Sequence, residues 1–272
     1  MRFGCCLNML STQPDGTGAE HLNMLKAAGY DYVELPLAEM CAMPESDLLR
    51  LREKLASLDL SCETCNNFFP KTFRLTGADA EPARASEYAA RALALATSLG
   101  AKRVVFGSGP AKNVPDGFPI SSGYEQIVCL LQTIAPIAAE QEITIAIEPL
   151  RKAECNLINT FAEGCRLAED AAHPNVKVLV DYYHFAVEQE PMENLRTLGE
   201  KWLTHVHFAE PAGRIYPEAD PEGRYLAFFR TLAEIHYDGR VSIEAYSADY
   251  RAQAGAALRL LREVAENAAE RK

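Results

Sequence analysis

Eight short strand-like runs alternate with eight helix-like segments along this 272-residue chain. The helix-like segments show helical spacing of apolar residues or a high content of Ala, Leu and Glu. The predicted strands are Arg2–Met9, Tyr32–Leu37, Ser61–Phe69, Arg103–Gly109, Thr144–Leu150, Lys177–Tyr183, Leu203–Ala209 and Val241–Tyr246. The predicted helices are Glu20–Ala28, Glu45–Leu58, Ala80–Leu99, Tyr124–Gln141, Thr160–Ala172, Met192–Lys201, Leu226–His236 and Ala252–Ala268.

This alternation predicts an α/β fold of the (β/α)8 or TIM-barrel type, because each strand is followed by a helix that returns the chain to the same edge of a parallel sheet. The length is close to the roughly 250 residues of such barrels. No Pro/Gly/Ser-rich linker interrupts the chain, so we expect residues 1–272 to form one barrel domain. An open Rossmann-type sheet is the alternative, since the number of short strands is the least certain part of the prediction.

The charge balance argues against polyanionic partners. The chain has 27 Lys and Arg against 38 Asp and Glu, a formal net charge of −11, and no long basic stripe. Proteins that bind duplex nucleic acid or anionic membranes normally present a cationic face. We find no apolar run long enough to cross a membrane and no convincing signal peptide. The expectation is therefore a cytoplasmic enzyme with a small-molecule substrate, no nucleic acid partner and no membrane association.

The eight cysteines are scattered, and one pair, Cys62 and Cys65, fits a C-x-x-C pattern. Such a pair occurs in redox sites and in half of a zinc site. Here it lies inside a predicted strand, where no helix N-terminus lowers the pKa of a thiol, and no second pair completes a zinc tetrad. A structural role is favoured for both cysteines.

Four acidic or imidazole residues lie at the ends of the last four predicted strands. Each of them precedes a polar or turn-prone segment. They are Glu148 in ITIAIEPL, Asp181 in VKVLVDYYH, His207 in LTHVHFAE and Glu244 in RVSIEAYS, separated by 33, 26 and 37 residues. Residues at the carboxyl ends of neighbouring barrel strands converge on one place. Three carboxylates would repel one another there, and a divalent cation removes that conflict. The sequence therefore predicts a metal site made by these four residues.

The ligand set and the side-chain alternation along the strands agree with this interpretation. Oxygen-rich ligands with one imidazole favour a hard cation, so Mn²⁺ is the leading candidate, with Mg²⁺, Co²⁺ and Zn²⁺ as alternatives. Side chains alternate along a strand. If Glu148 points into the barrel, Ala146 does too, while Ile147 faces the helices; His207 inward likewise places His205 inward, one layer deeper.

Such a site suits proton transfer next to a carbonyl group. A metal ion acts as a Lewis acid on the carbonyl and stabilises an enediolate, and the proton transfer needs a positioned base. We predict that Glu148 and Glu244 are this acid/base pair, one removing a proton and the other returning it on the opposite face. The turn-rich stretch 107–122 is long enough to be a functional loop, and Asn66, Asn67, Phe68 and Phe69 end a strand where they could line the mouth of the pocket.

The motifs IEPL, DYYH, HVHFAE and IEAY resemble those of the xylose isomerase-like barrels, and among these the sugar 3-epimerases and hydroxypyruvate isomerase-like enzymes. The resemblance extends over the whole chain, with its specific motifs in the second half. It implies that Glu148, Asp181, His207 and Glu244 bind the metal and that Glu148 and Glu244 also act as acid and base. It further implies that Glu154, His184 and Arg214 bind substrate, and that Phe118 stands where some epimerases stack a Trp on the sugar.

The expected activity is that of a metal-dependent isomerase or epimerase acting on a ketose or related polyol. A metal-dependent dehydratase of the inosose or dehydroshikimate type is the alternative, because it uses the same metal and enolate chemistry. An endonuclease IV-like enzyme is disfavoured by the six histidines and the −11 charge. A non-catalytic binding barrel is disfavoured because binding alone does not require two bases. We also expect a homo-oligomer, a dimer or tetramer paired through the helical layer.

Overall fold

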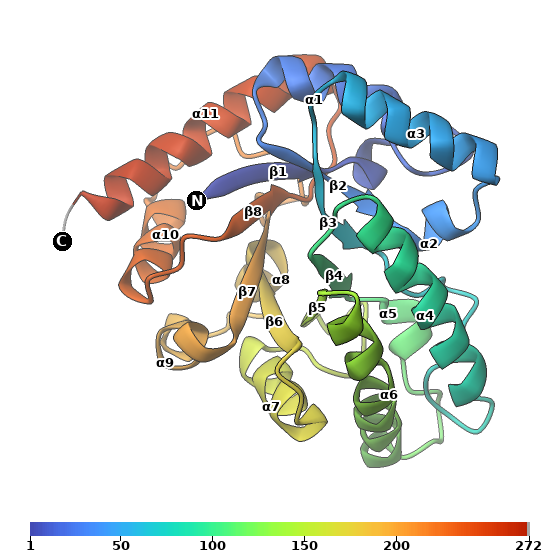
Figure 1. The fold of residues 1–272 in the computed structure, drawn as a ribbon. Helices are drawn as coiled ribbons and strands as arrows, with labels where there is room; N and C mark the ends of the chain where they lie inside the picture. Colours follow the sequence, from blue (N-terminus) through green and yellow to red (C-terminus); the bar gives the residue numbers. More distant parts are fainter. Residues whose placement is uncertain (271–272) are drawn as a thin grey trace.

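The computed structural model describes residues 1–270 and contains a closed barrel of eight parallel strands in the order β1 to β8 (Figure 1). The strands are β1 (Arg2–Cys6), β2 (Tyr32–Pro36), β3 (Cys62–Asn66), β4 (Arg103–Phe106), β5 (Thr144–Ile147), β6 (Val176–Asp181), β7 (Leu203–Phe208) and β8 (Arg240–Ile243). The helices are the short 3-10 turns η1 (Leu7–Leu10) and η2 (Ala19–His21), and α1 (Leu22–Ala28), α2 (Leu37–Cys41), α3 (Glu45–Ser57), α4 (Pro82–Ser98), α5 (Gly109–Lys112), α6 (Ile120–Glu140), α7 (Phe161–Ala171), α8 (Tyr182–Val187), α9 (Met192–Trp202), α10 (Arg224–Glu234) and α11 (Tyr250–Ala269).

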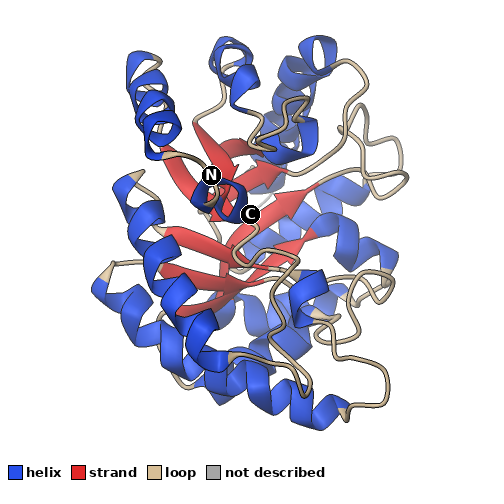
Figure 2. Cartoon of the chain, turned by 90° about the vertical axis from the view of Figure 1, so that its right-hand side faces the viewer, coloured by secondary structure: helices blue, strands red, loops and turns tan. Residues whose placement is uncertain are grey.

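Closure of the barrel confirms the predicted fold class and excludes the open sheet. The first and last strands pair in parallel, with Arg2 beside Arg240 and Cys5 beside Ile243. A doubly wound sheet would leave two strand edges unpaired instead. Figure 2 shows the helices packed around the central strands.

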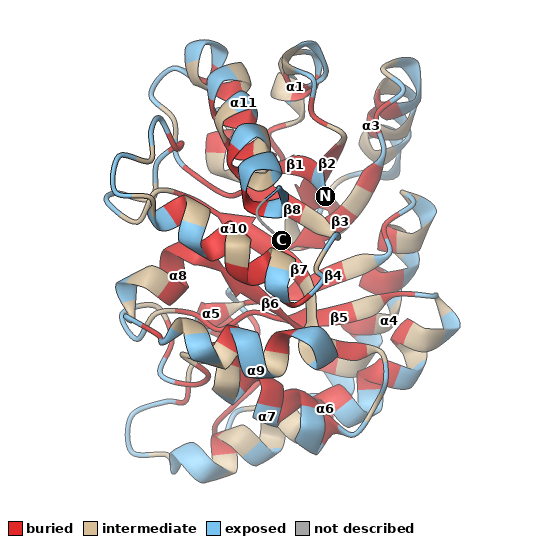
Figure 3. Ribbon diagram, turned by 90° about the vertical axis from the view of Figure 1, so that its left-hand side faces the viewer, coloured by how far each residue is buried: buried red, intermediate tan, exposed pale blue. Residues whose placement is uncertain are grey.

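The core has two parts, as the alternation of side chains requires. The large cluster lies between the strands and the surrounding helices, and the helices turn their exposed residues outward (Figure 3). A separate small cluster of Val105, Ala146 and Leu179 comes from β4, β5 and β6. Ala146 is the inward position predicted from Glu148, and Leu179 lies two residues before Asp181, on the same face of its strand. Parity in this part of the barrel is therefore as predicted.

Several predicted strands end too late. The first one stops at Cys6 and continues as η1, and the third and fifth stop at Asn66 and Ile147. The sixth ends at Asp181, whose side chain accepts a 2.8 Å hydrogen bond from the Tyr183 N–H and so caps α8. The predicted strands are too long because apolar residues continue after the last ladder hydrogen bond of each strand. These residues pack under the loops.

Two predictions about individual segments need correction. Stretch 107–122 is not only loop, since it contains α5, and α6 begins at Ile120 rather than at Tyr124. Trp202 ends α9 and is half-buried, with the Lys177 and Lys201 ammonium groups 5.1 and 4.3 Å from its ring centre. A ring between two lysine side chains is stabilised by cation–π attraction without full burial.

The C-x-x-C pair lies in β3, buried, with its two sulfur atoms 3.8 Å apart, and all eight cysteines are free thiols. The neighbouring Cys62 thiol and burial raise the pKa of Cys65 well above its usual range, which fits a structural role.

Among residues 1–270, no helix combines the length and the apolar character that a membrane crossing requires.

Candidate active site

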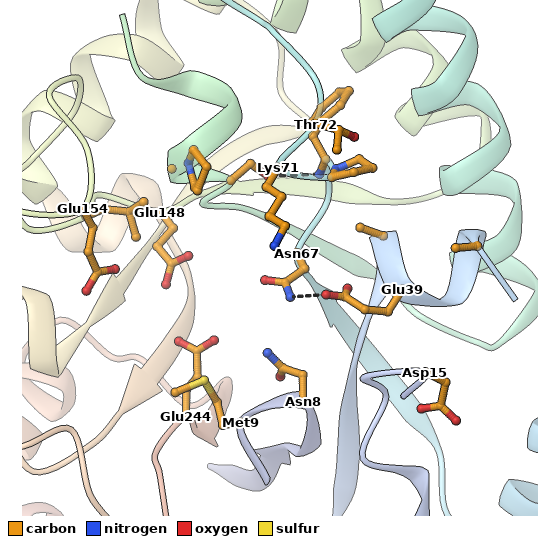
Figure 4. A pocket seen from close by; sticks show the side chains of 18 of the residues that line it. Asn8, Met9, Asp15, Glu39, Asn67, Lys71, Thr72, Glu148, Glu154 and Glu244 are labelled. Carbon is orange, nitrogen blue, oxygen red and sulfur yellow. Dashed lines mark hydrogen bonds between the residues drawn. The ribbon is translucent and has the colours of Figure 1, made fainter. Parts of the chain in front are cut away.

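A cavity of about 1020 Å³ opens at the carboxyl ends of the strands. Its floor and one wall come from the second half of the barrel, and the opposite wall comes from the loops after the first four strands (Figure 4). The lining residues of the second half are Glu148, Leu150, Glu154, His184, Arg214 and Glu244. Figure 4 shows the carboxylates of Glu148 and Glu244 pointing toward each other across the cavity.

The structure brings the four predicted metal ligands together. Glu148 directly follows β5, Asp181 ends β6, His207 lies near the end of β7, and Glu244 directly follows β8. Their ligand atoms all lie within 4.8 Å of one another, and all four residues are buried. The strand register explains part of this, since Asp181 and His207 are direct neighbours across the β6–β7 ladder.

His207 stands between the two candidate acid/base residues. Its Nδ1 atom lies 3.1 Å from Oε1 of Glu148 and 3.0 Å from Oε2 of Glu244. The other oxygen of Glu244 accepts a 3.1 Å hydrogen bond from the Asn66 amide, which in turn donates to Asn8 at 3.0 Å. These contacts hold the Glu244 carboxylate in a fixed orientation.

Burial and the mutual charges shift the pKa values in this cluster. Burial raises the pKa of Glu148, with the Glu244 charge adding to it, and raises the pKa of Asp181 to about 6. Burial acts in the same direction on Glu244, but the charges of His207 and Arg214 outweigh it and hold its pKa well below the usual range. Burial lowers the pKa of His207, yet the Glu244 and Glu34 carboxylates outweigh that and raise it.

These residues fit a divalent cation. They offer three carboxylates and one imidazole nitrogen, the hard donor set that suits Mn²⁺ or Mg²⁺ and that Zn²⁺ also accepts. In the protein alone, two cationic groups compensate the carboxylates: His207, and the Arg214 guanidinium, which lies 2.6 Å from Glu244 and 3.3 Å from Asp181. Carboxylates this close together repel one another unless a positive charge compensates them, and a bound cation can supply that charge.

The three residues predicted to bind substrate reach the same cavity from one side. The Arg214 guanidinium lies 3.8 Å from the Glu154 carboxylate and over the Tyr183 ring, 4.9 Å from its centre. Glu154 also pairs with Arg151 at 2.7 Å. Arg214 has a left-handed backbone, φ 52°, in the turn that follows β7. A non-glycine residue held in this strained region is common at ligand sites.

His184 is oriented so that it can donate a hydrogen bond into the cavity. Its Nδ1 accepts a 3.2 Å bond from the Arg151 N–H, so in the neutral ring the proton is on Nε2. Burial lowers the pKa of His184 to about 4, which keeps the ring neutral at pH 7. The buried Nε2 has no hydrogen-bond partner and lies 3.4 Å from Asp181. An unpaired buried donor beside a cavity is suited to a ligand oxygen.

The opposite wall agrees only in part with the sequence analysis. Asn67 and Phe69 line the cavity, together with Ser108, Gly109 and Pro110 of the predicted functional loop, but Phe68 is buried in the core. Phe118 is not among the lining residues. It packs against the hydrophobic core, so the prediction that it replaces a stacking Trp is wrong.

A glycine makes room for Glu148. A Cβ atom placed on Gly107 would lie 2.1 Å from Oε2 of Glu148, too close for any side chain. Gly107 follows β4, next to β5, so the absence of a side chain there lets the Glu148 carboxylate occupy its position.

Two buried charged residues beside the site were not identified from the sequence. Glu34 of β2 contacts His207 from below, and Lys112 of α5 donates a 3.3 Å hydrogen bond to the backbone carbonyl of Glu148. Both are fully buried. The available signal for Glu34 was a lone carboxylate in the apolar run YVELPL; for Lys112, inside a turn-rich stretch, the sequence contains no comparable signal.

Comparisons with known proteins agree with the fold and with the sequence motifs. The chain is 24% identical over 223 residues to the L-ribulose 3-epimerase of a Methylomonas species, covering 82% of this chain and 76% of that protein. It is 23% identical over 251 residues to the ketose 3-epimerase of Arthrobacter globiformis, covering 91% and 84%. A third relative, the 3-dehydro-D-guloside 4-epimerase of Escherichia coli, is 25% identical over 114 residues, covering 42% and 43%.

Among solved structures, the D-allulose 3-epimerase of a Methylomonas species in complex with D-allulose superposes with a TM-score of 0.84 at 23% identity, covering 97% of this chain and 96% of that one. At that identity the superposition establishes the fold alone. A sequence model of the family described as xylose isomerase-like TIM barrel matches residues 22–264. The chain thus belongs to the family of xylose isomerase-like TIM barrels.

Proposed function

We propose that this protein is a metal-dependent sugar epimerase that inverts a carbon next to a carbonyl group. The observation that carries the proposal is the pair of buried carboxylates, Glu148 and Glu244, held 3.1 and 3.0 Å from one imidazole nitrogen and pointing toward each other across a large cavity. Inversion requires that a proton leave one face of a carbon and arrive on the other. Two carboxylates that face each other meet that requirement, whereas binding alone does not require two bases.

The activities of the relatives support the same reaction class. Two of them are 3-epimerases of ketoses, and the third is a 4-epimerase of a 3-dehydro sugar. In each case the inverted carbon is adjacent to the ketone. We therefore propose a ketose, or a keto sugar of related structure, as the substrate.

The metal would be held by Glu148, Asp181, His207 and Glu244, and we expect Mn²⁺. A bound divalent ion supplies Lewis acidity that makes the C–H bond beside the carbonyl more acidic. One of Glu148 and Glu244, as the ionised base, removes the proton from one face of the carbon, and the other, as the protonated acid, delivers a proton to the opposite face. His184 Nε2–H donates to a substrate oxygen, and Arg214 and Glu154 bind neighbouring hydroxyl groups. A cytoplasmic location and a homo-oligomeric, one-domain protein remain predictions.

Proton NMR in deuterated water tests the proposal. The purified protein is incubated with Mn²⁺ and a panel of D-fructose, D-tagatose, D-psicose and L-ribulose. We expect an epimeric product that carries deuterium at the inverted carbon, with no loss of water. Loss of water would identify the dehydratase alternative instead. If the Glu148→Gln and Glu244→Gln variants keep full activity, the proposed acid/base pair is wrong.

A further inference from the structure

Beneath the candidate metal centre, three strands meet at one buried carboxylate, Glu34 of β2. Oε1 of Glu34 lies 3.0 Å from Nε2 of His207, and Oε2 lies 2.8 Å from Nε2 of His205. Ser242 of β8 donates a 2.6 Å hydrogen bond to Oε2. All of these residues are fully buried, and Glu34 is not among the residues that line the cavity. We propose that Glu34 is a positioning residue that orients His207 for metal binding.

Glu34 determines which nitrogen of the His207 ring carries the hydrogen. An ionised carboxylate only accepts hydrogen bonds, so the Nε2 atom that faces Glu34 must carry the hydrogen. In the neutral ring the lone pair then belongs to Nδ1. That atom faces the Glu148 and Glu244 carboxylates, at 3.1 and 3.0 Å. Glu34 thereby selects the one tautomer of His207 that can donate a lone pair to a cation between these carboxylates.

Glu34 is itself held in place from two sides. Its bonds to Ser242 and His205 use Oε2, which leaves Oε1 for His207 alone. Tyr32, from the same strand as Glu34, lies 2.8 Å from Ser242; because the Ser242 hydroxyl donates to Glu34, the Tyr32 hydroxyl donates to Ser242. The carboxylate therefore cannot rotate away from His207 without breaking two other hydrogen bonds. A histidine ligand whose second nitrogen donates to a carboxylate is bound more firmly and has its ring orientation fixed.

The competing explanation is that Glu34 and His207 form a purely structural ion pair. A measurement of metal affinity distinguishes this explanation from a positioning role. The inference depends on the metal site of the proposed function but not on the sugar reaction, so the test measures Mn²⁺ binding by calorimetry without substrate. We expect Glu34→Gln to weaken Mn²⁺ binding about 10- to 100-fold, the usual loss when such a partner of a ligand is changed. Tyr30→Phe is the matched control: it removes a buried hydroxyl that donates to the backbone carbonyl of Ala254 and contacts neither Glu34 nor His207, so it should leave the Mn²⁺ affinity unchanged.

Nitrogen NMR of the Zn²⁺-loaded protein supplies a second readout that a structural role would not change. In the wild type, the His207 signals should identify Nε2 as protonated and Nδ1 as metal-bound, and Glu34→Gln should populate a second ring state. If Glu34→Gln does not fold, Glu34→Asp replaces it, because it keeps the charge but is one methylene too short for all three bonds. A folded variant of either kind with wild-type Mn²⁺ affinity and unchanged His207 signals overturns the inference. A wild type that binds Mn²⁺ but converts no sugar overturns the proposed function and leaves this inference standing.

Discussion

The two halves of the barrel contribute different things to the same cavity. A buried acidic or imidazole residue lies at or next to the end of each of the last four strands. The ligand atoms of these four residues lie within 4.8 Å of one another. The segments that follow the first four strands form the opposite wall, which contains Asn67, Phe69 and Ser108 and also the carboxylate of Glu39. Two further charged residues of that half contact the cluster from outside the cavity lining: Glu34 through the His207 ring, and Lys112 through the backbone carbonyl of Glu148.

This difference indicates a division of labour. Charged groups that must be desolvated and fixed lie on strands, where the ladder hydrogen bonds hold the backbone. The wall that faces them is built from loops, where changes in sequence alter the shape of the cavity without disturbing the cluster. We therefore expect substitutions in the second half to abolish turnover, and substitutions in the first half to change which substrate is accepted.

The largest effect should come from the carboxylate pair. Glu148→Gln or Glu244→Gln removes a proton-transfer group and a metal ligand together, so we expect kcat to fall by about 10³-fold or more, since acid–base catalysis alone contributes roughly 10²–10⁴. Steady-state kinetics at saturating Mn²⁺ measures this. Glu63→Gln is the control, because Glu63 pairs with Arg2 and Arg240, away from the cavity. A comparable loss of kcat in the control would contradict the division between the halves.

Arg214 should have the next largest effect. Its guanidinium contacts Glu244 and Asp181 and forms part of the cavity wall, with 14% of the side chain exposed. Arg214→Gln should reduce kcat/KM by roughly 10- to 100-fold, the value of a charge-assisted hydrogen bond of about 1.5–3 kcal/mol. The same variant should lower the melting temperature of the metal-free protein, because two carboxylates lose their counter-charge. Unchanged kcat/KM together with a lower melting temperature would restrict Arg214 to a structural role.

The pH dependence of metal binding follows from the raised pKa values. Asp181, with a pKa of about 6, holds a proton below that pH in the metal-free protein, and His207, with a raised pKa, holds one to higher pH. A cation must displace both protons below about pH 6 and only the His207 proton above it. Affinity for Mn²⁺ should therefore fall as the pH falls, with an additional factor of up to about ten per pH unit below pH 6. Calorimetry at pH 5, 6 and 7 measures the affinity and the protons released, and a constant affinity across this range would contradict the assignment.

The same contrast explains what the sequence could and could not predict. Glu148, Asp181, His207 and Glu244 each follow a run of apolar residues, and parity alone places them on one face at one end of the barrel. For Glu34 the sequence contains only a lone carboxylate in an apolar run, and for Lys112 it contains no signal, because their partners lie 173 and 36 residues away in the chain. Phe118 shows that a family resemblance can also place a residue wrongly. The resemblance assigns this loop residue to the cavity, but its side chain packs against the hydrophobic core.

The smallest effect, and the most selective one, is expected at Glu39 on the loop-built wall. One oxygen of Glu39 accepts a 3.2 Å hydrogen bond from Asn67, and the other is buried in the protein without a partner, so a substrate hydroxyl is well placed to donate to it. Glu39→Ala should change the relative KM values of different ketoses by about fivefold, the effect of one hydrogen bond near 1 kcal/mol, while kcat and Mn²⁺ affinity stay the same. Glu53→Ala, on the exposed face of α3, is the matched control. If Glu39→Ala instead lowers kcat equally for every ketose, both walls of the cavity contribute to catalysis. The proposed difference between the two halves of the barrel is then wrong.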